Sequence, residues 1–358
     1  MRLQMWCGIT YRVPRITYHA SRAACGAPTG EPSHLQTFPL ANFPTCKLSY
    51  FRTFTLANLL TSKLAHLPTF RDRLRRGEPL ARYTAARLGG PADALLAVRS
   101  ADELAEAVRL LWEAEIPFHI LGGGSNVLVS DRGVRGVVLL NRARKARFAE
   151  RGVWAEAGAN LGALARQAAI KGLGGLEWAG GIPGTLGGAV SGNAGAHGGD
   201  IAAILERAEI LHRERGRLHI SAADLGFGYR TSALKRGELP GIVLSASLRL
   251  HPRPPEEIQA RMETYLEHRR RTQPPGASMG SMFKNPPGDY AGRLIEAAGL
   301  KGTRIGGAEI SPVHANFFIN RGGATAQDVY RLIQLARETV ARQFGITLEL
   351  EIELLGEF

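Results

Sequence analysis

The feature that most constrains the fold of this chain is a glycine-rich stretch near its middle. Nine of the twenty residues from Gly180 to Gly199 are glycine, whereas glycine makes up about 7% of an average protein. Glycine loses more conformational entropy on folding than any other residue, so proteins concentrate it where a side chain would block a turn or a ligand. Successive free backbone N–H groups form hollows that suit phosphate oxygens. The stretch therefore predicts a backbone cradle for an anionic ligand.

A second glycine cluster lies about sixty residues upstream. Residues 122–126 read Gly-Gly-Gly-Ser-Asn and follow an apolar run, Phe118 to Leu121. The cluster lacks the G-x-G-x-x-G spacing of a Rossmann nucleotide site and its ribose-binding acid. By itself it is as compatible with a plain loop as with a ligand site. Two glycine cradles in one chain favour a single long diphosphate cofactor bound by both.

The positive charge of the chain is concentrated at its N-terminal end. The formal net charge is +13 over 358 residues, and residues 1–80 carry +8 of it, from eleven Lys or Arg and three Asp or Glu. The remainder is mildly basic and has no basic stripe interleaved with aromatics, which argues against nucleic acid as a partner. No run approaches the ~18–20 apolar residues of a membrane-spanning helix. We therefore expect a soluble globular protein that binds small anions.

Residues 1–78 are expected to be a non-native or disordered leader. A Thr-Phe pair recurs there with period 16, at residues 37, 53 and 69, and two periods are too few for a stacked solenoid. A wrongly assigned start is the favoured explanation, and a transit peptide or an accessory segment are the alternatives. A body without cysteine fits a reducing cytoplasm. The leader holds all three cysteines: Cys7, Cys25 and Cys46.

The body, from near Pro79, is expected to mix helices with short strands. Caps, proline stops and apolar spacing predict helices that end near Pro117, Lys171, Arg271, Gly299 and Gly345. The basic end of the third helix, residues 269–271, is interpreted as a complement to the helix dipole. Strands are predicted over residues 118–121, 127–129, 136–140 and, with clean alternation, 346–354.

Six motifs in a fixed order make the sequence more specific. They are Arg87-Leu88-Gly89-Gly90-Pro91-Ala92, Gly122 to Asn126, Gly180 to Ala196, Phe227 to Ser232, Gly280 to Pro286, and Glu349-Leu350-Glu351. In this order they resemble the UDP-N-acetylenolpyruvoylglucosamine reductase family (MurB, the UDP-N-acetylmuramate dehydrogenases) of bacterial cell-wall synthesis. The resemblance covers residues 80–358, and the brevity of the body is similar to the shorter class of the family.

The resemblance implies an α+β fold. Two subdomains of the vanillyl-alcohol-oxidase (PCMH) type would bind FAD, and a C-terminal α+β domain would bind the substrate. We expect the first FAD-binding subdomain over residues 79–143 with the tail 352–358, the second over 144–270, and the substrate-binding domain over 271–351.

The resemblance also implies a reaction. The family uses NADPH and non-covalent FAD to reduce UDP-N-acetylglucosamine enolpyruvate to UDP-N-acetylmuramate, a peptidoglycan precursor. NADPH would reduce the flavin and leave, and the sugar nucleotide would then take hydride in the same cleft. We expect a cytoplasmic monomer. The alternative is another flavoenzyme of this fold that oxidises a hydroxyl substrate, but such an enzyme would lack the motifs at residues 229–230 and 281–286.

Three residues are carried over from the family as catalytic. Arg230 would hold the substrate carboxylate as a bidentate fork and stabilise the negative charge that develops there. Ser281 would protonate the carbon that bears the ether oxygen, with help from Lys284 or the local backbone. Glu351 would polarise the carboxylate, in protonated form if burial raises its pKa. Periodicity alone does not distinguish Glu351 from Glu349 or Glu353, and each of the three assignments competes with a plain turn or surface role.

The remaining site residues are expected to bind ligands. The substrate contacts would be Tyr229, Lys284 and Asn285. His197 has no partner at metal-ligand spacing, so neither a metal nor covalent flavin attachment is expected. The FAD contacts would be Gly122, Gly123, Gly124, Ser125, Asn126, Gly180, Gly181, Ile182, Pro183, Gly184, Thr185, Gly187, Gly188, Asn193, Ala194 and Gly195.

Overall fold

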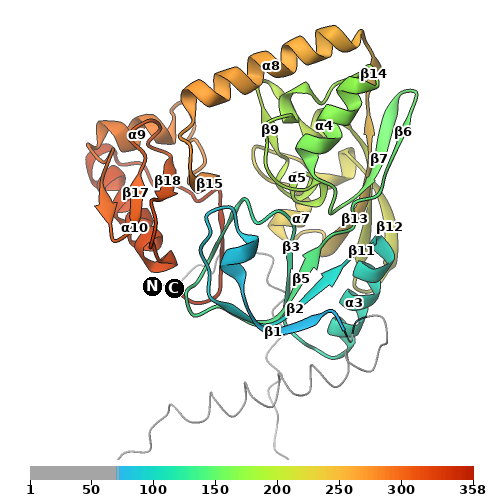
Figure 1. Cartoon of the computed structure of the whole chain (residues 1–358), viewed down its shortest axis with the longest axis horizontal. Helices are drawn as coiled ribbons and strands as arrows, with labels where there is room; N and C mark the ends of the chain where they lie inside the picture. The colour runs from blue at the N-terminus through green and yellow to red at the C-terminus, as the bar shows by residue number, and fades with distance from the viewer. Residues whose placement is uncertain (1–69, 71) are drawn as a thin grey trace, which may run out of the picture.

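The computed structural model describes residue 70 and residues 72–358. The expectations for residues 1–69 therefore lie outside the described residues. The described residues form three sheets of four or five strands with their own helices, and three two-stranded pairs. The long helix α8 (Pro255–Thr272) runs across the top from the second of the larger sheets to the third (Figure 1). No helix in the described part is long and apolar enough to cross a membrane.

The first sheet has the strand order β1-β2-β5-β3. Strands β2, β5 and β3 are parallel, and β1 adds to the edge in antiparallel fashion. Helix α3 packs its Leu104, Val108 and Leu111 into a core beneath the sheet, and the Ser100 side chain accepts the Glu103 N–H at its start. The bounds are β1 (Leu74–Pro79), β2 (Pro91–Val98), α3 (Ala101–Glu113), β3 (Phe118–Leu121) and β5 (Val134–Asn141).

The folded body begins earlier than the boundary near Pro79 that the sequence suggested. Leu74 already pairs with Leu96 in the sheet, so residues 74–78 of the expected leader belong to the first sheet. Strand β1 reads Leu-Arg-Arg-Gly-Glu-Pro and is largely exposed. Charged side chains are common on edge strands, where they discourage pairing with other molecules. Such a strand lacks the hydrophobic alternation by which strands are predicted.

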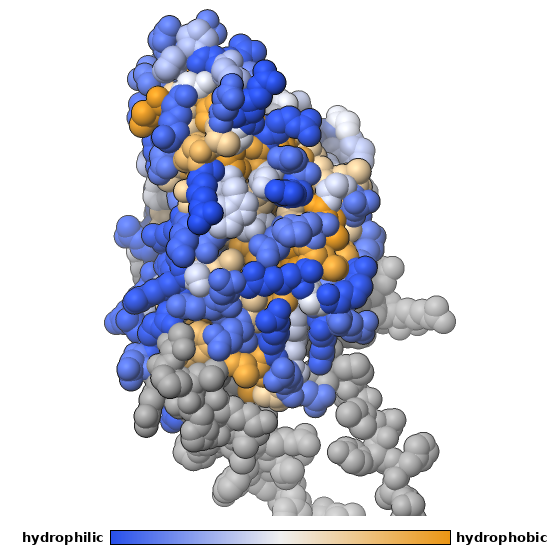
Figure 2. Space-filling model, turned by 90° about the vertical axis from the view of Figure 1, so that its right-hand side faces the viewer, coloured by the Kyte–Doolittle hydropathy of each residue, from blue (hydrophilic) through white to orange (hydrophobic). Residues whose placement is uncertain are grey.

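The second sheet is antiparallel throughout, with the order β12-β11-β13-β7-β6. Its inner face packs on α4, α5 and α8 in the largest core cluster. The side of the molecule that carries β6 and β12 is mostly hydrophilic (Figure 2). The bounds are β6 (Ala146–Ala149), β7 (Gly152–Glu156), α4 (Leu161–Ile170), α5 (Leu186–Gly192), β11 (Leu205–His212), β12 (Gly216–Ser221) and β13 (Gly241–Arg249).

Short elements join these pieces. Two-stranded pairs form between β9 and β10 and between β8 and β14. The bounds are η1 (Leu80–Tyr83), β8 (Leu173–Gly174), η2 (Glu177–Ala179), β9 (Gly195–Ala196), β10 (Gly199–Asp200), α6 (Ile201–Ile204), η3 (Ala223–Leu225), α7 (Ala233–Arg236) and β14 (His251–Pro252).

The third sheet is antiparallel with the order β15-β18-β17-β16. Helix α10 covers it with Val329, Leu332 and Ile333, the face that the sequence predicted, between its Thr325 capping box and Gly345 in the left-handed conformation. The bounds are β15 (Ala277–Ser281), α9 (Ala291–Ala297), β16 (Arg304–Ile305), β17 (Ala308–Ile310), β18 (Phe317–Asn320) and α10 (Ala326–Phe344). All five predicted helices are confirmed.

The C-terminal segment returns to the first unit. Strand β19 (Glu353–Leu355) pairs in parallel with β4 (Val127–Val129). The predicted strand over residues 346–354 is confirmed only at this end, because its earlier part has a single bridge, from Leu350 to Phe283. Leu348 and Ile352 are nevertheless buried, as the alternation predicted. Alternation of apolar and polar residues indicates which side chains are buried. Formation of a strand also requires a neighbouring strand to pair with.

Candidate active site

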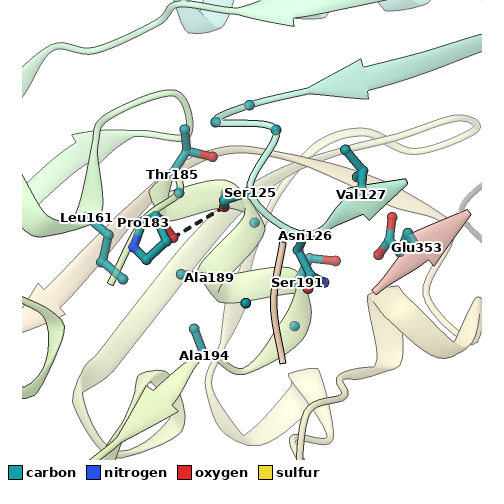
Figure 3. A pocket seen from close by; sticks show the side chains of 18 of the residues that line it. Ser125, Asn126, Val127, Leu161, Pro183, Thr185, Ala189, Ser191, Ala194 and Glu353 are labelled. Atoms are coloured by element: carbon teal, nitrogen blue, oxygen red, sulfur yellow. Dashed lines mark hydrogen bonds between the residues drawn. The ribbon is translucent and has the colours of Figure 1, made fainter. Parts of the chain in front are cut away.

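A cleft of about 500 Å³ lies where the three units meet, and both glycine clusters line it. Figure 3 shows Ser125 and Asn126 on one side and Pro183 and Thr185 on the other, with the Ser125 hydroxyl donating a 3.3 Å hydrogen bond to the Pro183 carbonyl. The expected FAD contacts that line the cleft are Gly122, Gly123, Gly124, Ser125, Asn126, Ile182, Pro183, Gly184, Thr185, Gly187, Gly188, Ala194 and Gly195.

The glycines of the first cluster are required by close packing against the second glycine loop and against the backbone at Tyr83. A Cβ at Gly123 would lie 2.9 Å from the Gly184 Cα, closer than real Cβ contacts allow. Gly124 has φ +61°, and a Cβ there would collide with the Tyr83 carbonyl. Both loops line the cleft, and a Cβ at Gly188 or Gly192, which also line it, would meet no atom closer than 3.7 Å. Bare backbone therefore faces the cleft at these positions, and this is the surface that a diphosphate needs. The residues present fit FAD.

Gly180, Gly181 and Asn193 do not line this cleft. A Cβ at Gly180 would lie 2.6 Å from the Met262 side chain, and one at Gly181 would lie 2.9 Å from Arg269 Cδ. These two glycines therefore let helix α8 approach the glycine-rich stretch. The Asn193 side chain is bonded to neighbouring loops instead. The sequence around Gly180, Gly181 and Asn193 could not show that they do not line the cleft, because the residues that contact them lie elsewhere in the chain.

Arg230, Ser281 and Glu351 all line the cleft, although they come from three separate segments. The Arg230 Nε atom lies 2.7 Å from Glu351 Oε1, at an angle that is unfavourable for a hydrogen bond. The Arg230 guanidinium also lies over the Tyr229 ring, 5.8 Å from its centroid. The guanidinium is thus held by charge and ring contact, so its remaining N–H groups stay available to a carboxylate ligand.

Backbone pairing places Ser281 beside Glu351. Ser281 ends β15, directly after Gly280 with φ +78°, where the register with β18 shifts. The next residue, Met282, accepts a 2.9 Å hydrogen bond from the Glu351 N–H. The buried Asn316 side chain fixes the same segment through the Phe283 N–H at 2.9 Å and the Phe283 carbonyl at 2.8 Å.

Burial raises the pKa of the Glu351 carboxyl above its ordinary value. The positive charges of Arg230, Lys235 and Lys284 act in the opposite direction and do not fully offset this desolvation. The Asn126 amide donates a 3.1 Å hydrogen bond to the Glu351 carbonyl. The first glycine cluster is thereby tied to the backbone that carries this carboxyl.

The three expected substrate contacts lie next to the cleft and do not line it. Tyr229 is 57% exposed, and its hydroxyl accepts the Asn285 N–H at 3.4 Å. Lys284 donates to Glu349 at 3.2 Å. Asn285 lines a neighbouring hollow of about 370 Å³ that shares Ser281 with the cleft. A ligand longer than the cleft can therefore reach this group past Ser281.

Sequence reasoning missed several polar residues of the cleft, among them Lys235, Arg269 and Gln273. Burial lowers the pKa of the Arg269 guanidinium, which favours an anion as its partner. Lys235 lies 3.9 Å from Glu353. The basic end of helix α8 was the available signal for Arg269, but the helix dipole explained it equally well. Nothing local marked Lys235 or Gln273, whereas Glu353, which also lines the cleft, was left as an alternative to Glu351.

His197 has a packing role. Its ring stacks on Tyr265 with centroids 4.2 Å apart and meets His268 edge-on at 5.4 Å. Across residues 72–358 there is no cluster of three or more His, Cys, Asp or Glu that could hold a metal ion.

Comparison with known proteins identifies the family. A model of an FAD binding domain matches residues 92–221, and a model of the UDP-N-acetylenolpyruvoylglucosamine reductase C-terminal domain matches residues 272–355. The UDP-N-acetylenolpyruvoylglucosamine reductase of Chloroflexus aggregans is 46% identical over 289 residues, which cover 79% of this chain and 97% of the relative. This chain belongs to the UDP-N-acetylenolpyruvoylglucosamine reductase family.

Other members of the UDP-N-acetylenolpyruvoylglucosamine reductase family agree. The Moorella thermoacetica protein of that name is 50% identical over 285 residues, covering 78% of this chain and 92% of the relative. The crystal structure of the reductase (MurB) from Thermus caldophilus superposes with a TM-score of 0.69 at 41% identity, covering 79% of this chain and all of that one. The expected α+β fold with an FAD-binding part and a C-terminal reductase domain is confirmed. Family membership also favours the reductase over the hydroxyl-oxidising alternative.

Proposed function

We propose that this cleft reduces UDP-N-acetylglucosamine enolpyruvate to UDP-N-acetylmuramate with NADPH, through Arg230, Ser281 and Glu351. The chain is an FAD-dependent oxidoreductase of the reductase family. The observation that carries the proposal is the meeting of these three residues in one cleft with two bare-backbone glycine clusters. When bound, FAD supplies the hydride that it has received from NADPH.

The cofactor contacts are assigned from the cleft lining. The first cluster, residues 122–126, and the opposite loop, residues 182–188, would hold the diphosphate with backbone N–H groups and hydroxyls. We extend this set by Arg269, in the last turn of α8, and Gln273, the residue directly after that helix, which both line the cleft. Burial disfavours the charged form of the Arg269 guanidinium. An anionic partner would stabilise that charged form.

Arg230 and Glu351 act on the substrate carboxylate. Hydride addition to the vinyl carbon builds negative charge that spreads onto this carboxylate. A planar, permanently charged guanidinium can bind both of its oxygens. Glu351 would donate to the same group when protonated, and burial shifts the pKa of this carboxyl in the direction that such a role requires. Together they stabilise charge where it develops during the reaction.

Ser281 completes the reduction as the proton donor. Its hydroxyl proton passes to the carbon that bears the ether oxygen, which has become nucleophilic after hydride addition. A free hydroxyl is a weak acid, so its position must be controlled closely. Gly280, the register shift in β15 and the Asn316 bonds provide that control.

The sugar nucleotide would extend beyond Ser281 toward Tyr229, Lys284 and Asn285. The Lys284 ammonium suits a diphosphate as a point charge. The division into residues 79–143 with 352–358, 144–270 and 271–351 remains our proposal for the two FAD-binding subdomains and the substrate domain, with the first now starting at Leu74. The pairing of β19 with β4 supports the return of the tail. We also propose a cytoplasmic monomer.

A single substitution tests this function. The full chain is purified with its flavin, and NADPH consumption is followed with and without the enolpyruvyl sugar nucleotide. We expect Ser281→Ala to slow turnover by about 10²–10⁴-fold, the usual worth of a proton donor, while NADPH still reduces the flavin at the wild-type rate. Ser278→Ala, on the same strand β15, is the control and should turn over normally. Unchanged turnover in Ser281→Ala would refute the assignment.

A further inference from the structure

Arg230 occupies an unfavourable backbone conformation in a tight turn. Its φ is +56°, in the left-handed region that is unfavourable for a residue other than glycine. The turn is closed in both directions, by the Gly228 N–H to the Thr231 carbonyl at 3.1 Å and the Thr231 N–H to the Gly228 carbonyl at 3.2 Å. Such strain persists only where the surroundings fix it.

The Asn193 side chain supplies one of these fixing contacts. Its Nδ2 donates to the Gly228 carbonyl at 3.1 Å and to Asp200 Oδ2 at 3.3 Å, and its Oδ1 accepts the Ala202 N–H at 3.0 Å. Asn193 is 6% exposed. A primary amide has two N–H donors, and both are used inside the protein. No donor of this side chain remains for a cofactor phosphate.

The C-terminal side of the Arg230 turn, at Ser232, is also held by the end of helix α5. Ser232, which is fully buried, donates its hydroxyl to the Ser191 carbonyl at 2.6 Å and caps helix α7. Ser191 and Gly192, immediately before Asn193, line the cofactor cleft. The end of α5 thus contacts the cleft with one face and holds both flanks of the arginine turn with the other.

We propose that Asn193 is a positioning residue that holds Arg230 in its carboxylate-binding geometry through the Gly228 carbonyl. This inference rests on the proposed role of Arg230. It replaces the expectation that Asn193 contacts FAD. It also gives a reason for asparagine at this position, because Asn193 itself has φ +44°, a conformation that asparagine tolerates better than most residues, and its amide reaches across to the turn.

The test removes the amide without straining the backbone. Asn193→Gly keeps the left-handed conformation and deletes the donor to Gly228. Binding of the enolpyruvyl sugar nucleotide to the oxidised holoenzyme is measured by calorimetry without NADPH, so no turnover occurs. We expect affinity to fall about tenfold, whereas FAD content and the rate of flavin reduction by NADPH stay within about twofold of wild type. Equal losses in substrate binding and flavin reduction would overturn the inference.

A double-mutant cycle shows whether Asn193 acts through Arg230. Arg230→Lys keeps a positive charge beside Glu351 but loses the bidentate fork. If Asn193 acts through the arginine, Asn193→Gly should cost less than about twofold in the Arg230→Lys background. Full additivity would overturn the inference. If the Arg230→Lys variant binds substrate as tightly as wild type, the proposed function of Arg230 is wrong, and so is the inference about Asn193. If Arg230→Lys binds substrate weakly but Asn193→Gly binds it as tightly as wild type, only the inference about Asn193 is wrong.

Two further variants separate positioning from loop integrity. The exchange Asn193→Asp with Asp200→Asn keeps a hydrogen bond possible between these two positions but removes the side-chain donor to the Gly228 carbonyl, which then keeps only the Thr231 N–H. We expect substrate affinity to remain low in this exchange, and recovery to the wild-type level would overturn the inference. If Asn193→Gly does not fold, substrate binding by this exchange variant tests the inference instead. His197→Gly is the matched control, with the same backbone region at φ +52°, and should bind substrate normally.

Discussion

At the scale of single residues, the glycines of the two clusters have two functions that look alike in sequence. Gly123 and Gly184 let the two loops that line the cleft pack against each other, whereas Gly181 makes room for the Arg269 side chain. The chemistry of the cleft then depends on side chains held in unusual states. Arg230 is held in the left-handed region, and Glu351 is buried with a raised pKa.

The raised pKa of Glu351 predicts a pH dependence of stability. A carboxyl with a higher pKa in the folded state binds its proton more tightly there than in the unfolded chain. Stability from this group is therefore present at low pH and is lost as pH rises from the ordinary value of 4.5 through the raised pKa. We expect the free energy of unfolding of Glu351→Gln, relative to wild type, to increase over that interval. Urea denaturation of the flavin-free proteins at several pH values measures it, and a difference independent of pH would contradict the assignment.

At the scale of elements, helix α10 begins against a residue of the first unit. The Asp131 carboxylate accepts the Ala326 N–H at 2.8 Å and the Gln327 N–H at 2.9 Å, in addition to the capping box of Thr325 and Asp328. The first N–H groups of a helix have no partners within it, so this carboxylate satisfies two of them. The same contact joins the third unit, which contains α10, to the first unit.

Asp131→Ala should therefore lower stability without affecting chemistry. We expect a loss of about 1 kcal/mol in the free energy of unfolding, from the range of about 0.5–2 kcal/mol for helix caps. Urea denaturation gives the value, and flavin content should be unchanged. Glu150→Ala, in an exposed turn, is the control and should change stability by less than about 0.5 kcal/mol. Equal effects of the two substitutions would show that the Asp131 contact contributes nothing specific.

At the scale of the whole molecule, the cleft collects residues from all three sheets. Ile120 comes from the first sheet, Val243 from the second and Ser281 from the third. Helix α8 spans the second and third units (Figure 1), and β19 returns the chain to the first. A ligand in this position contacts every unit at once, so its binding couples their stabilities.

Removal of FAD should therefore destabilise the whole described fold. A ligand that binds only the folded state adds about 2.7 kcal/mol at a free concentration of 100 Kd. We expect the flavin-free protein to unfold at a lower urea concentration than the holoprotein, and added FAD to restore the midpoint in a concentration-dependent way. Circular dichroism and flavin fluorescence should report one shared transition in the holoprotein. A midpoint that does not respond to FAD would contradict this position of the cofactor.

The sequence by itself determined the local structure and the family. Ser100 and Thr325 began their helices, Gly345 ended one, and the apolar spacing of α10 chose its buried face, because caps and periodicity act within a few residues. The ordered motifs identified Arg230, Ser281 and Glu351 as candidates for one site. These features are readable because each depends on residues close together in the chain, or on motifs shared with relatives.

Only the tertiary structure decided which of these features meet, because the deciding contacts join residues far apart in sequence. Whether a glycine lines the cleft or lets a helix approach depends on what packs against it, so Gly180 and Gly181 could not be separated from Gly184 by sequence. The tail alternates from Ile346 to Leu354, but it forms a strand only where β4 lies alongside. Asn193 lies within a cofactor motif, yet burial directs its amide to the arginine turn instead of the cleft.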